Sequence, residues 1–360
     1  KVRPLILLVR SSRRRYQRSM TRLGFLGAMN RDLVVQQDCA TVLDALRINA
    51  SPLVETPISD EDAQRGAEFL QELGAADYLG GSAFNAARVA ALLNNGNEID
   101  LAYFGVAGTL GPSRAHLEAL DGWGLDTSGV ETSAQPPATC LAIVEQAGRT
   151  LLTAHGANVD IADWLRREQS TLAAAIARCD VIHITSYLDP ASPDLIARIL
   201  ERARIDNPEL IVSLDPGMAW IAPGGDGFAS LLAQTNILHL NSEEFTCLLG
   251  KASPPEIGAG LQPGWLLVAR THEGVTLYSE KGSAPYAPEL QDMDVRDATG
   301  AGDTFCGAFL WSYCQDMTRP QRAVALGFAL ARHKVGMAGP LALTNATRRE
   351  IVTKIEEAEW

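Results

Sequence analysis

The sequence predicts an α/β protein built on a mostly parallel β-sheet. From Leu23 onward, short apolar runs alternate with longer segments of helical periodicity, which is the pattern of consecutive βα units. The chain has 360 residues, of which 46% are hydrophobic and 21% are charged. This composition is typical of globular proteins and argues against a disordered, collagenous or coiled-coil chain. The length permits two ordinary domains or one large α/β domain.

Six buried strands are predicted from short apolar runs bounded by turn residues. They are Leu23–Ala28, Ile99–Val106, Val181–Ser186, Leu210–Leu214, Ile237–Leu240 and Trp265–Ala269. The helices predicted between them are Ala86–Leu93, Arg114–Leu120, Ile161–Arg178, Pro193–Ala203 and Ser242–Leu249. A last helix-compatible run follows the segment Asp297–Phe305 and extends through Cys314.

The first strand is followed by a connection of 47 residues, Leu33–Leu79. Ser59–Leu73 within it predicts a helix, because a serine N-cap precedes three acidic residues and a glycine follows the last turn. Val42–Leu46 and Asp77–Leu79 are expected to be strands. A connection this long usually has a function, and we expect the segments 33–79 and 137–155 to form a lid. The alternative is a surface insertion that never contacts a substrate.

Basic residues are concentrated at the start of the chain. Eight of the 31 Lys and Arg residues, and none of the 43 acidic residues, lie among the first 22 positions. The remaining chain is therefore strongly acidic and repels nucleic acid and anionic membranes. We interpret residues 1–19 as a basic N-terminal extension and 20–360 as the folded domain. Nucleic-acid or membrane binding by the extension would be an accessory role only. No apolar stretch reaches the roughly 20 residues that a membrane span needs.

The cysteine pattern favours a reducing cytoplasm. The six cysteines are far apart and form neither a CxxC pair nor a Cys/His cluster at zinc spacing. Neither a disulfide scaffold nor a structural metal site is expected.

The segment Asp297–Phe305 carries the most specific chemical signal. It reads Asp-Ala-Thr-Gly-Ala-Gly-Asp-Thr-Phe. Small residues just before a helix let backbone N–H groups converge on one point, where the positive end of the helix attracts an anion. The segment therefore predicts a phosphate cradle, although it lacks the lysine of a Walker A loop. Asp303 would lie beside the cradle, placed to take a proton from a hydroxyl, unless it only caps the helix.

Polar residues follow two other strands. Gly80-Gly81-Ser82-Ala83-Phe84-Asn85 precedes a predicted helix, so a ligand can approach the glycines closely and Asn85 can exchange hydrogen bonds with sugar hydroxyls. Asn30 and Asp32 lie at the carboxyl end of the first strand, where open α/β sheets bind ligands. Their spacing of two residues places them on one side of an extended chain. Helix capping and ordinary turn chemistry are the alternatives.

Five motifs in this order resemble those of the ribokinase family, also called the phosphofructokinase-B group, which includes fructokinases and nucleoside kinases. The motifs are residues 27–32 (GAMNRD), 80–85 (GGSAFN), 156–158 (GAN), 241–244 (NSEE) and 297–303 (DATGAGD). The resemblance spans about residues 22–345, and its last motif is highly specific. It implies a ribokinase-like three-layer sandwich, with a central mostly parallel sheet and a small β lid, and ATP-dependent phosphate transfer to an alcohol of a sugar or nucleoside.

The resemblance also implies roles for individual residues. Asp303 would be the catalytic base, and an anion hole would be formed by the N–H groups of Gly300, Ala301 and Gly302. The residues implied to hold substrate hydroxyls are Asn30, Asp32, Gly80, Gly81 and Asn85.

Two further motifs imply cation and nucleotide contacts. Asn241 and Glu244 match the NxxE motif of the family, which helps to organise Mg²⁺ and phosphates. Glu244 would act through water, because magnesium keeps several of its waters. Asp297 occupies a position that in many members is associated with a monovalent cation, usually K⁺; whether this chain uses one is open.

Two segments depart from the family pattern. Relatives usually carry TxGxxG where this chain reads Ala-Arg-Thr-His-Glu-Gly at 269–274. Nucleotide contacts are expected from Arg270, Thr271 and Gly274. Arg270 or His272 could supply positive charge to the phosphates, and the equally weighted alternative is that both side chains point into solvent. The substrate-binding glutamate of ribokinases is absent near Tyr187, whose ring is available to stack on a base or a sugar face. A buried structural tyrosine is the alternative.

The sequence thus predicts an ATP-dependent kinase acting on a hydroxyl of a sugar or sugar-containing small molecule. A nucleoside kinase of the adenosine type is the alternative, and a catalytically silent relative with a regulatory binding role is a third hypothesis. ATP and Mg²⁺ are the expected cofactors, with K⁺ open. We expect a small-molecule partner, neither nucleic acid nor membrane, and consider a homodimer formed through the lid.

Overall fold

The computed structural model describes residues 20–357, with the exception of 96–97, 111–112, 147, 188, 289–293 and 338. The extension predicted at residues 1–19 lies outside these described residues. Within them, no helix combines the length and the apolar content that a bilayer crossing requires.

Nine strands form the main sheet. Their bounds are β1 Thr21–Leu26, β5 Ile99–Ala107, β6 Asp126–Thr132, β9 Val181–Thr185, β10 Ile211–Asp215, β11 Ile237–Leu240, β12 Leu266–Arg270, β13 Val275–Ser279 and β14 Gly282–Tyr286. The order across the sheet is β14-β13-β12-β11-β10-β9-β1-β5-β6. All neighbours from β12 to β6 are parallel, and β13 and β14 add an antiparallel edge.

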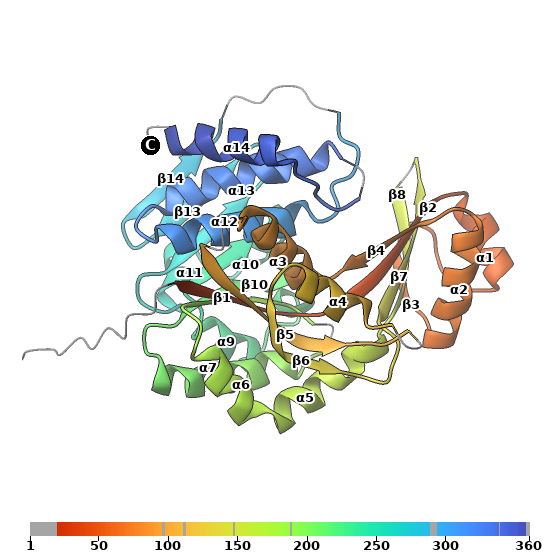
Figure 1. Cartoon of the computed structure of the whole chain (residues 1–360), viewed down its shortest axis with the longest axis horizontal. Coiled ribbons are helices and arrows are strands. Elements are labelled where there is room, and N and C mark those ends of the chain that lie inside the picture. Colours follow the sequence, from red (N-terminus) through yellow and green to blue (C-terminus); the bar gives the residue numbers. More distant parts are fainter. Residues whose placement is uncertain are drawn as a thin grey trace, which may run out of the picture.

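Helices cover both faces of this sheet (Figure 1). One layer contains α3 Ser82–Leu93, α4 Ala115–Gly122, α12 Ala301–Gln315 and α13 Pro320–Val335, with α14 Asn345–Glu357 packed on α13. The other layer contains α5 Ile161–Arg167, α6 Gln169–Ile176, α7 Ser192–Asp206, α8 Gly217–Ile221, α9 Asp226–Leu232, α10 Ser242–Leu249 and α11 Pro254–Ala259. The three layers confirm the predicted fold class.

Burial on both faces explains why the central strands are recognisable in the sequence. In β1, Leu23 and Phe25 pack into the core that includes α3 and α12, whereas Leu26 packs into the core on the opposite face. A parallel strand covered on both sides must be apolar at nearly every position. Each such side chain contributes roughly 1.5–3 kcal/mol by leaving water, so these strands anchor the residues that follow them.

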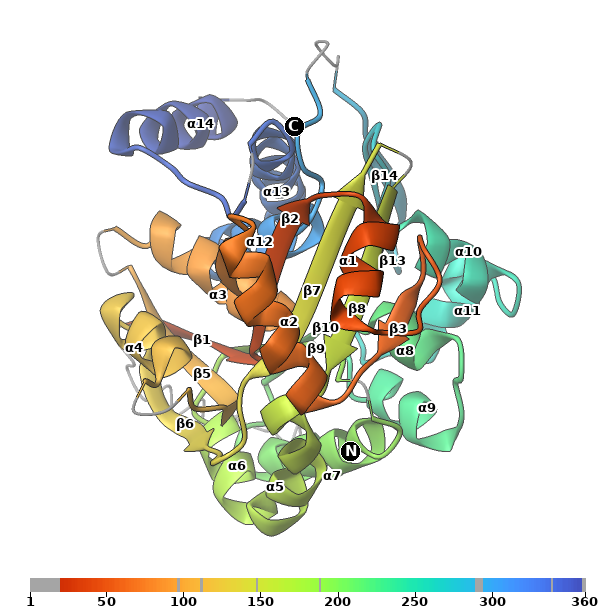
Figure 2. The same ribbon diagram turned by 90° about the vertical axis from the view of Figure 1, so that its right-hand side faces the viewer.

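A second sheet of five strands stands beside the main one. Its strands, in spatial order, are β3 Glu55–Pro57, β8 Gly148–Ala154, β7 Ala138–Glu145, β2 Asn30–Gln36 and β4 Ala76–Gly80. Because β2 starts soon after β1 ends, the chain passes directly from one sheet to the other. The helices α1 Cys39–Leu46 and α2 Asp60–Glu72 cover one face of this sheet (Figure 2). The predicted lid segments contribute to this sheet; their closing over a substrate stays a prediction.

Three local expectations need correction. Val42–Leu46 is helical and not a strand, because Asp38 caps α1 through the Thr41 N–H at 2.8 Å and the helix buries its apolar side chains. The predicted helix over 161–178 divides into α5 and α6 at Glu168. α3 starts four residues early, at Ser82, because Gly81 forms its N-cap with a φ of 110°.

Candidate active site

The N-terminus of α12 forms the centre of the candidate site. Gly300, the N-cap, has a φ of 73°, a conformation that favours glycine. Its carbonyl oxygen accepts bonds from the Thr304 N–H at 2.9 Å and the Thr304 hydroxyl at 2.8 Å. The turn brings Ala301 and Gly302 to the wall of a cavity, with Asp303 in the first helical turn. The predicted anion hole and base therefore lie together at one helix end.

Asp303 has the electrostatic setting of a proton acceptor. The Asn85 side-chain amide donates a 2.9 Å hydrogen bond to its Oδ2. Burial raises the pKa of Asp303 to about 6, and the charge of Asp215 adds to this effect, while Asn85 acts in the opposite direction. The carboxylate is therefore ionised at neutral pH yet more basic than an exposed aspartate, which suits general base catalysis.

Asp32 is the second carboxylate in this part of the site. Burial raises its pKa to about 6, and the charges of Asp303 and Asp77 add to this effect. A Cβ atom at Gly80 would lie 2.1 Å from Asp32 Oδ2, so the glycine leaves the space that the carboxylate occupies. Among the described residues, none donates a hydrogen bond to Asp32. Its oxygens are available to hydroxyl donors.

Asn30 is held from two sides. The Asn158 amide donates to Asn30 Oδ1 at 3.1 Å, and His116 Nε2 lies 2.8 Å from the Asn30 carbonyl oxygen. Asn158 Oδ1 is buried without a partner among the described residues. Gly81 has a packing role here, because a Cβ atom would lie 2.1 Å from the Ala28 carbonyl oxygen.

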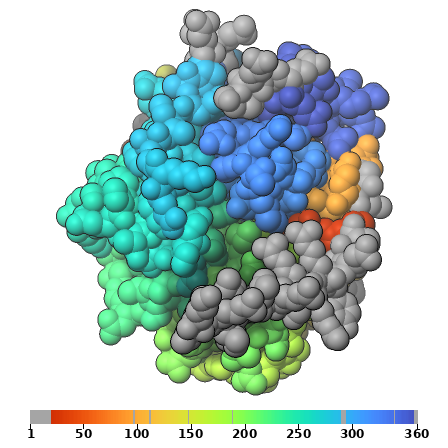
Figure 3. Space-filling model, turned by 90° about the vertical axis from the view of Figure 1, so that its left-hand side faces the viewer, coloured from red at the N-terminus to blue at the C-terminus, as the bar shows by residue number. Residues whose placement is uncertain are grey.

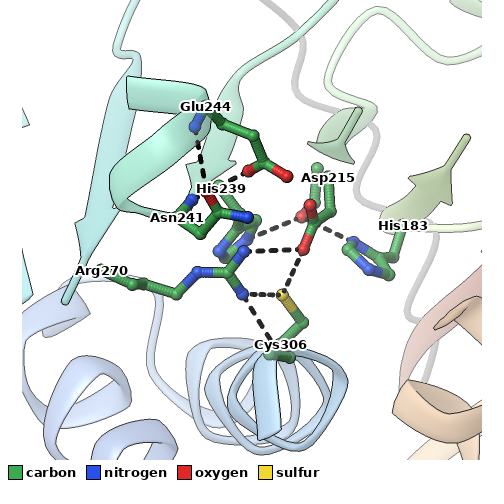
Figure 4. A network of polar contacts seen from close by, with 9 residues as sticks. His183, Asp215, His239, Asn241, Glu244, Arg270 and Cys306 are labelled. Atoms are coloured by element: carbon green, nitrogen blue, oxygen red, sulfur yellow. Dashed lines mark hydrogen bonds and ion pairs between the residues drawn. The ribbon is translucent and has the colours of Figure 1, made fainter. Parts of the chain in front are cut away.

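Arg270 leaves the end of β12 and enters the site from the other side (Figure 4). Its Nη2 donates to Asp215 Oδ2 at 2.9 Å, and its Nη1 donates to the Gly302 carbonyl and to Cys306 Sγ, both at 3.1 Å. Burial acts against the charged guanidinium, but the charge and the hydrogen bond of Asp215, together with neighbours such as Glu244, outweigh it and raise the pKa of Arg270. Only 11% of the Arg270 side chain is exposed, so the structure favours a site role over the solvent-exposed alternative.

Two buried histidines lie beside Ser213, two residues before Asp215 on β10. His183 Nδ1 and His239 Nε2 lie 3.0 and 3.1 Å from Ser213 Oγ. Burial lowers the pKa of His183 to about 4 and that of His239 well below its ordinary value. Both rings are therefore neutral at physiological pH, and Arg270 supplies the positive charge of the network.

Asn241 and Glu244 form a capping box at the start of α10. The Glu244 N–H donates to Asn241 Oδ1 at 2.9 Å, and the Asn241 N–H donates to Glu244 Oε2 at 2.8 Å. Burial raises the pKa of Glu244 to about 7, helped by the charge of Asp215. Arg270 is paired with Asp215, whereas Glu244 feels the guanidinium only through its charge, so the two carboxylates together leave negative charge for a cation to neutralise. This donor set fits Mg²⁺ held through water.

A cavity of about 630 Å³ is lined by part of these groups; Asn30, Asp32 and Asn85 are not among its lining residues. Its polar end contains Asp303, Arg270 and Glu244, with Thr271 on the wall. Its other end is mostly apolar and is lined by Val275, Val295, Phe328, Ala331 and Val335, with Arg332 among them. The apolar end lies where the β13–β14 hairpin and α13 meet, and Figure 3 shows these cyan and blue segments side by side. A ligand with a flat apolar group and a phosphate chain would fit this division.

Comparisons with known proteins identify the family of the chain. A family model described as pfkB family carbohydrate kinase matches residues 61–346. The chain belongs to this family. It is therefore an ATP-dependent phosphotransferase with a hydroxyl acceptor, and the predicted family is confirmed.

Two curated relatives are similar to this pfkB-family kinase at low identity. An uncharacterized sugar kinase from Archaeoglobus fulgidus is 26% identical over 219 residues, which cover 60% of this chain and 83% of the relative. An ATP-dependent ribose-1-phosphate kinase from Halopiger xanaduensis is 26% identical over 239 residues, which cover 66% of this chain and 74% of the relative.

Solved structures share the fold. The adenosine kinase from Sinorhizobium meliloti matches with a TM-score of 0.71 and 19% identity, covering 94% of this chain and 99% of that one. The nucleoside kinase from Burkholderia thailandensis in complex with inosine matches with a TM-score of 0.65 and 20% identity. The match covers 93% of this chain and 97% of that one. At these identities the likeness shows the fold alone.

The structure gives the surroundings of three residues considered for ligand contacts, and their roles stay predictions. Tyr187 is 2% exposed and packs beside Trp220, with ring centroids 6.3 Å apart, so the structure favours the buried tyrosine over an open stacking surface. Gly274 packs against the β-hairpin, because a Cβ atom would lie 2.3 Å from the Tyr286 carbonyl oxygen. His272 borders the cavity, but its side chain is 89% exposed.

The structure adds residues that sequence reasoning missed. Asp215 directly follows a predicted strand, a position that could have drawn attention to it. Arg149, from the β7–β8 hairpin, donates to Thr299 Oγ1 at 3.1 Å, and Lys334 donates to Asp297. Both contacts join segments that are far apart in sequence. No local sequence pattern could therefore predict them.

Proposed function

We propose that this kinase transfers the γ-phosphate of ATP to a hydroxyl of a sugar or a sugar-containing small molecule, with Asp303 as the general base. The observation that carries the proposal is the position of Asp303, which lies at the N-terminus of α12 with a pKa near 6. On one side lies Asp32, and on the other lies the cavity that contains Arg270.

In the proposed reaction, Asp303 Oδ accepts the proton of the attacking hydroxyl as that oxygen bonds to the γ-phosphorus, while the bond from this phosphorus to the bridging oxygen breaks and ADP leaves with the electron pair. The Asn85 amide holds the carboxylate in place. The backbone N–H groups of Gly300 and Gly302 are proposed to stabilise the negative charge that develops on the transferred group, and the helix end adds a favourable field. The Ala301 N–H, the third group predicted for the anion hole, instead donates to the Ala298 carbonyl oxygen at 3.2 Å. Arg270 fixes this turn through the Gly302 carbonyl.

The acceptor pocket suits a polyhydroxylated ring. The Asp32 carboxylate can only accept hydrogen bonds when ionised, so it selects donors such as hydroxyls. Asn30, Gly80, Gly81 and Asn85 complete the proposed contacts. The burial of Tyr187 removes the aromatic ring that the sequence offered for stacking on a base, and this supports a sugar over a nucleoside.

The nucleotide is proposed to occupy the cavity. Its apolar end, between Val275 and Phe328, suits a base, and Arg270, Thr271 and Asn241 lie towards the phosphates. Glu244 and Asp215 are proposed to hold Mg²⁺ through water. When bound, this ion would neutralise charge on the β- and γ-phosphates.

The five-stranded sheet is proposed to act as a lid. It carries Asn30 and Asp32 on β2, and its Arg149 already contacts the loop before α12. Closure would exclude water, which otherwise competes with the acceptor for the phosphate. The buried thiols of Cys39, Cys306 and Cys314 are free, which supports the cytoplasm as the proposed location.

The decisive experiment is a thermal-shift panel with a non-hydrolysable ATP analogue, followed by measurement of ADP release. Free sugars, sugar phosphates including ribose 1-phosphate, and nucleosides form the three arms. A true acceptor stabilises the folded protein by mass action and is then phosphorylated. Turnover with nucleosides alone would favour the nucleoside kinase, and binding without turnover in every arm would favour a silent relative.

A further inference from the structure

Lys334 is a fully buried lysine close to the catalytic loop. It lies in the last turn of α13 and is 2% exposed. Its Nζ donates to the Asp297 backbone carbonyl at 2.9 Å and lies 3.3 Å from Asp297 Oδ2. A buried lysine is rare unless its charge is paired, and among the described residues the ammonium contacts Asp297, in the loop before α12.

The surroundings of this ammonium are those of a bound cation. A backbone carbonyl and a carboxylate oxygen of the same residue converge on it, and such oxygens are the ligands of hard cations. The Gly339 N–H donates to the same Asp297 Oδ2 at 3.2 Å, so the segment after α13 is tied to the same carboxylate. The family resemblance associates Asp297 with a monovalent cation, and in this structure the Lys334 ammonium contacts two Asp297 oxygens of the kind that such an ion binds.

Asp297 transmits this contact to the anion hole. Its Oδ1 accepts the Thr299 N–H at 2.9 Å, and Thr299 immediately precedes the Gly300 turn. Burial acts to raise the pKa of Asp297, but the Thr299 N–H and the Lys334 charge outweigh it and lower the pKa. The carboxylate therefore stays ionised and keeps both contacts at any pH at which Asp303 is ionised.

We infer that the Lys334 ammonium takes the place of a monovalent cation and holds the Asp297–Gly300 turn in the shape that the anion hole needs. Lys334 is a positioning residue, because it acts through Asp297 and touches neither substrate nor phosphate. Phosphate transfer by this kinase then requires no added monovalent cation. The inference rests on the proposed function for its kinetic test, but its thermal test does not.

The first test uses the unaltered protein. Turnover is measured by chromatographic detection of ADP, since common coupling enzymes themselves need K⁺. The assay is run in potassium chloride and in N-methylglucamine chloride at equal ionic strength. We expect the same kcat and the same melting temperature in both salts. A severalfold increase of kcat in K⁺, or a clear rise of the melting temperature, overturns the inference.

The second test creates space for an external cation with Lys334→Ala. In N-methylglucamine we expect kcat to fall roughly 10–100-fold, as for a misplaced catalytic turn, with a small change in the KM for the acceptor. K⁺ or ammonium should restore part of kcat and raise the melting temperature. A variant that keeps normal turnover, or that no small cation rescues, contradicts the inference. Lys354→Ala, at an exposed lysine on α14, is the matched control and should show no cation effect.

The two proposals fail in different ways. If the unaltered protein phosphorylates no sugar or nucleoside, the proposed function fails. The comparison of melting temperatures in the two salts still decides the role of Lys334, because it needs no acceptor. If turnover is present but depends on K⁺, the function stands and the role assigned to Lys334 is wrong.

Discussion

Asp297 lies in the loop before α12 and Asp303 lies six residues later in the first turn of that helix, yet their carboxylates are in opposite states. Asp297 is bound by the Lys334 ammonium and by the Thr299 and Gly339 N–H groups, and its pKa lies below its ordinary value. Asp303 receives the Asn85 amide, and its pKa is raised to about 6. An aspartate side chain is thus stabilised as an anion at Asp297 and destabilised as an anion at Asp303.

The difference shows that two nearby aspartates can have different roles, one structural and one chemical. A carboxylate whose charge is compensated holds its shape over a wide pH range. A carboxylate that burial and neighbouring charge have made more basic can accept a proton at neutral pH. Asp32 resembles Asp303, because burial and the neighbouring charges of Asp303 and Asp77 raise its pKa as well.

The most direct test of this comparison is a substitution at Asp303. Asp303→Asn keeps the shape of the side chain but removes the base, so we expect kcat to fall roughly 10²–10⁴-fold with a much smaller change in acceptor KM. Steady-state release of ADP measures both. Asp316→Asn at the exposed C-cap of the same helix is the control. Near-normal turnover of the Asp303 variant would remove it from the mechanism.

The second prediction concerns compensation at Arg270. Arg270→Met leaves the Asp215 charge buried without its partner, which should lower the free energy of unfolding by about 3 kcal/mol. Nucleotide affinity should fall as well. Adding Asp215→Asn should restore part of the stability without restoring nucleotide binding. Urea unfolding and titration with an ATP analogue separate the two effects. If the double variant is as unstable as the single one, the charge argument is wrong.

The sequence predicted this site where its signals are local. A glycine-rich turn ahead of an apolar helix identified the segment Asp297–Asp303. Strands that are buried on both faces of the sheet were recognisable as apolar runs. Lys334 and Arg149 were missed because their contacts join segments 37 and 150 residues apart. Tyr187 follows a buried strand, and no local pattern determines whether such a ring points into the core or into the site.

The smallest expected effect is on stability, and its sign follows from the raised pKa of Asp303. The ordinary pKa of 3.8 rises to about 6 on folding, so the folded protein binds a proton more readily than the unfolded chain. Stability therefore rises as the pH falls from about 6 towards 4, and above pH 6 the ionised Asp303 carries its full cost.

Asp303→Asn removes that cost. At pH 8 we expect the variant to be more stable than the unaltered protein by about 1–2 kcal/mol, a value reduced for the partial solvent exposure of the site. Near pH 4 the two proteins should be equally stable. Asp297→Asn should behave in the opposite way, because its ionised form is the stabilised one and its contribution is lost only in acid. Urea unfolding at pH 4, 6 and 8 tests both signs. A destabilised Asp303 variant at pH 8 would show that the carboxylate is compensated after all, and the contrast between Asp297 and Asp303 would not hold.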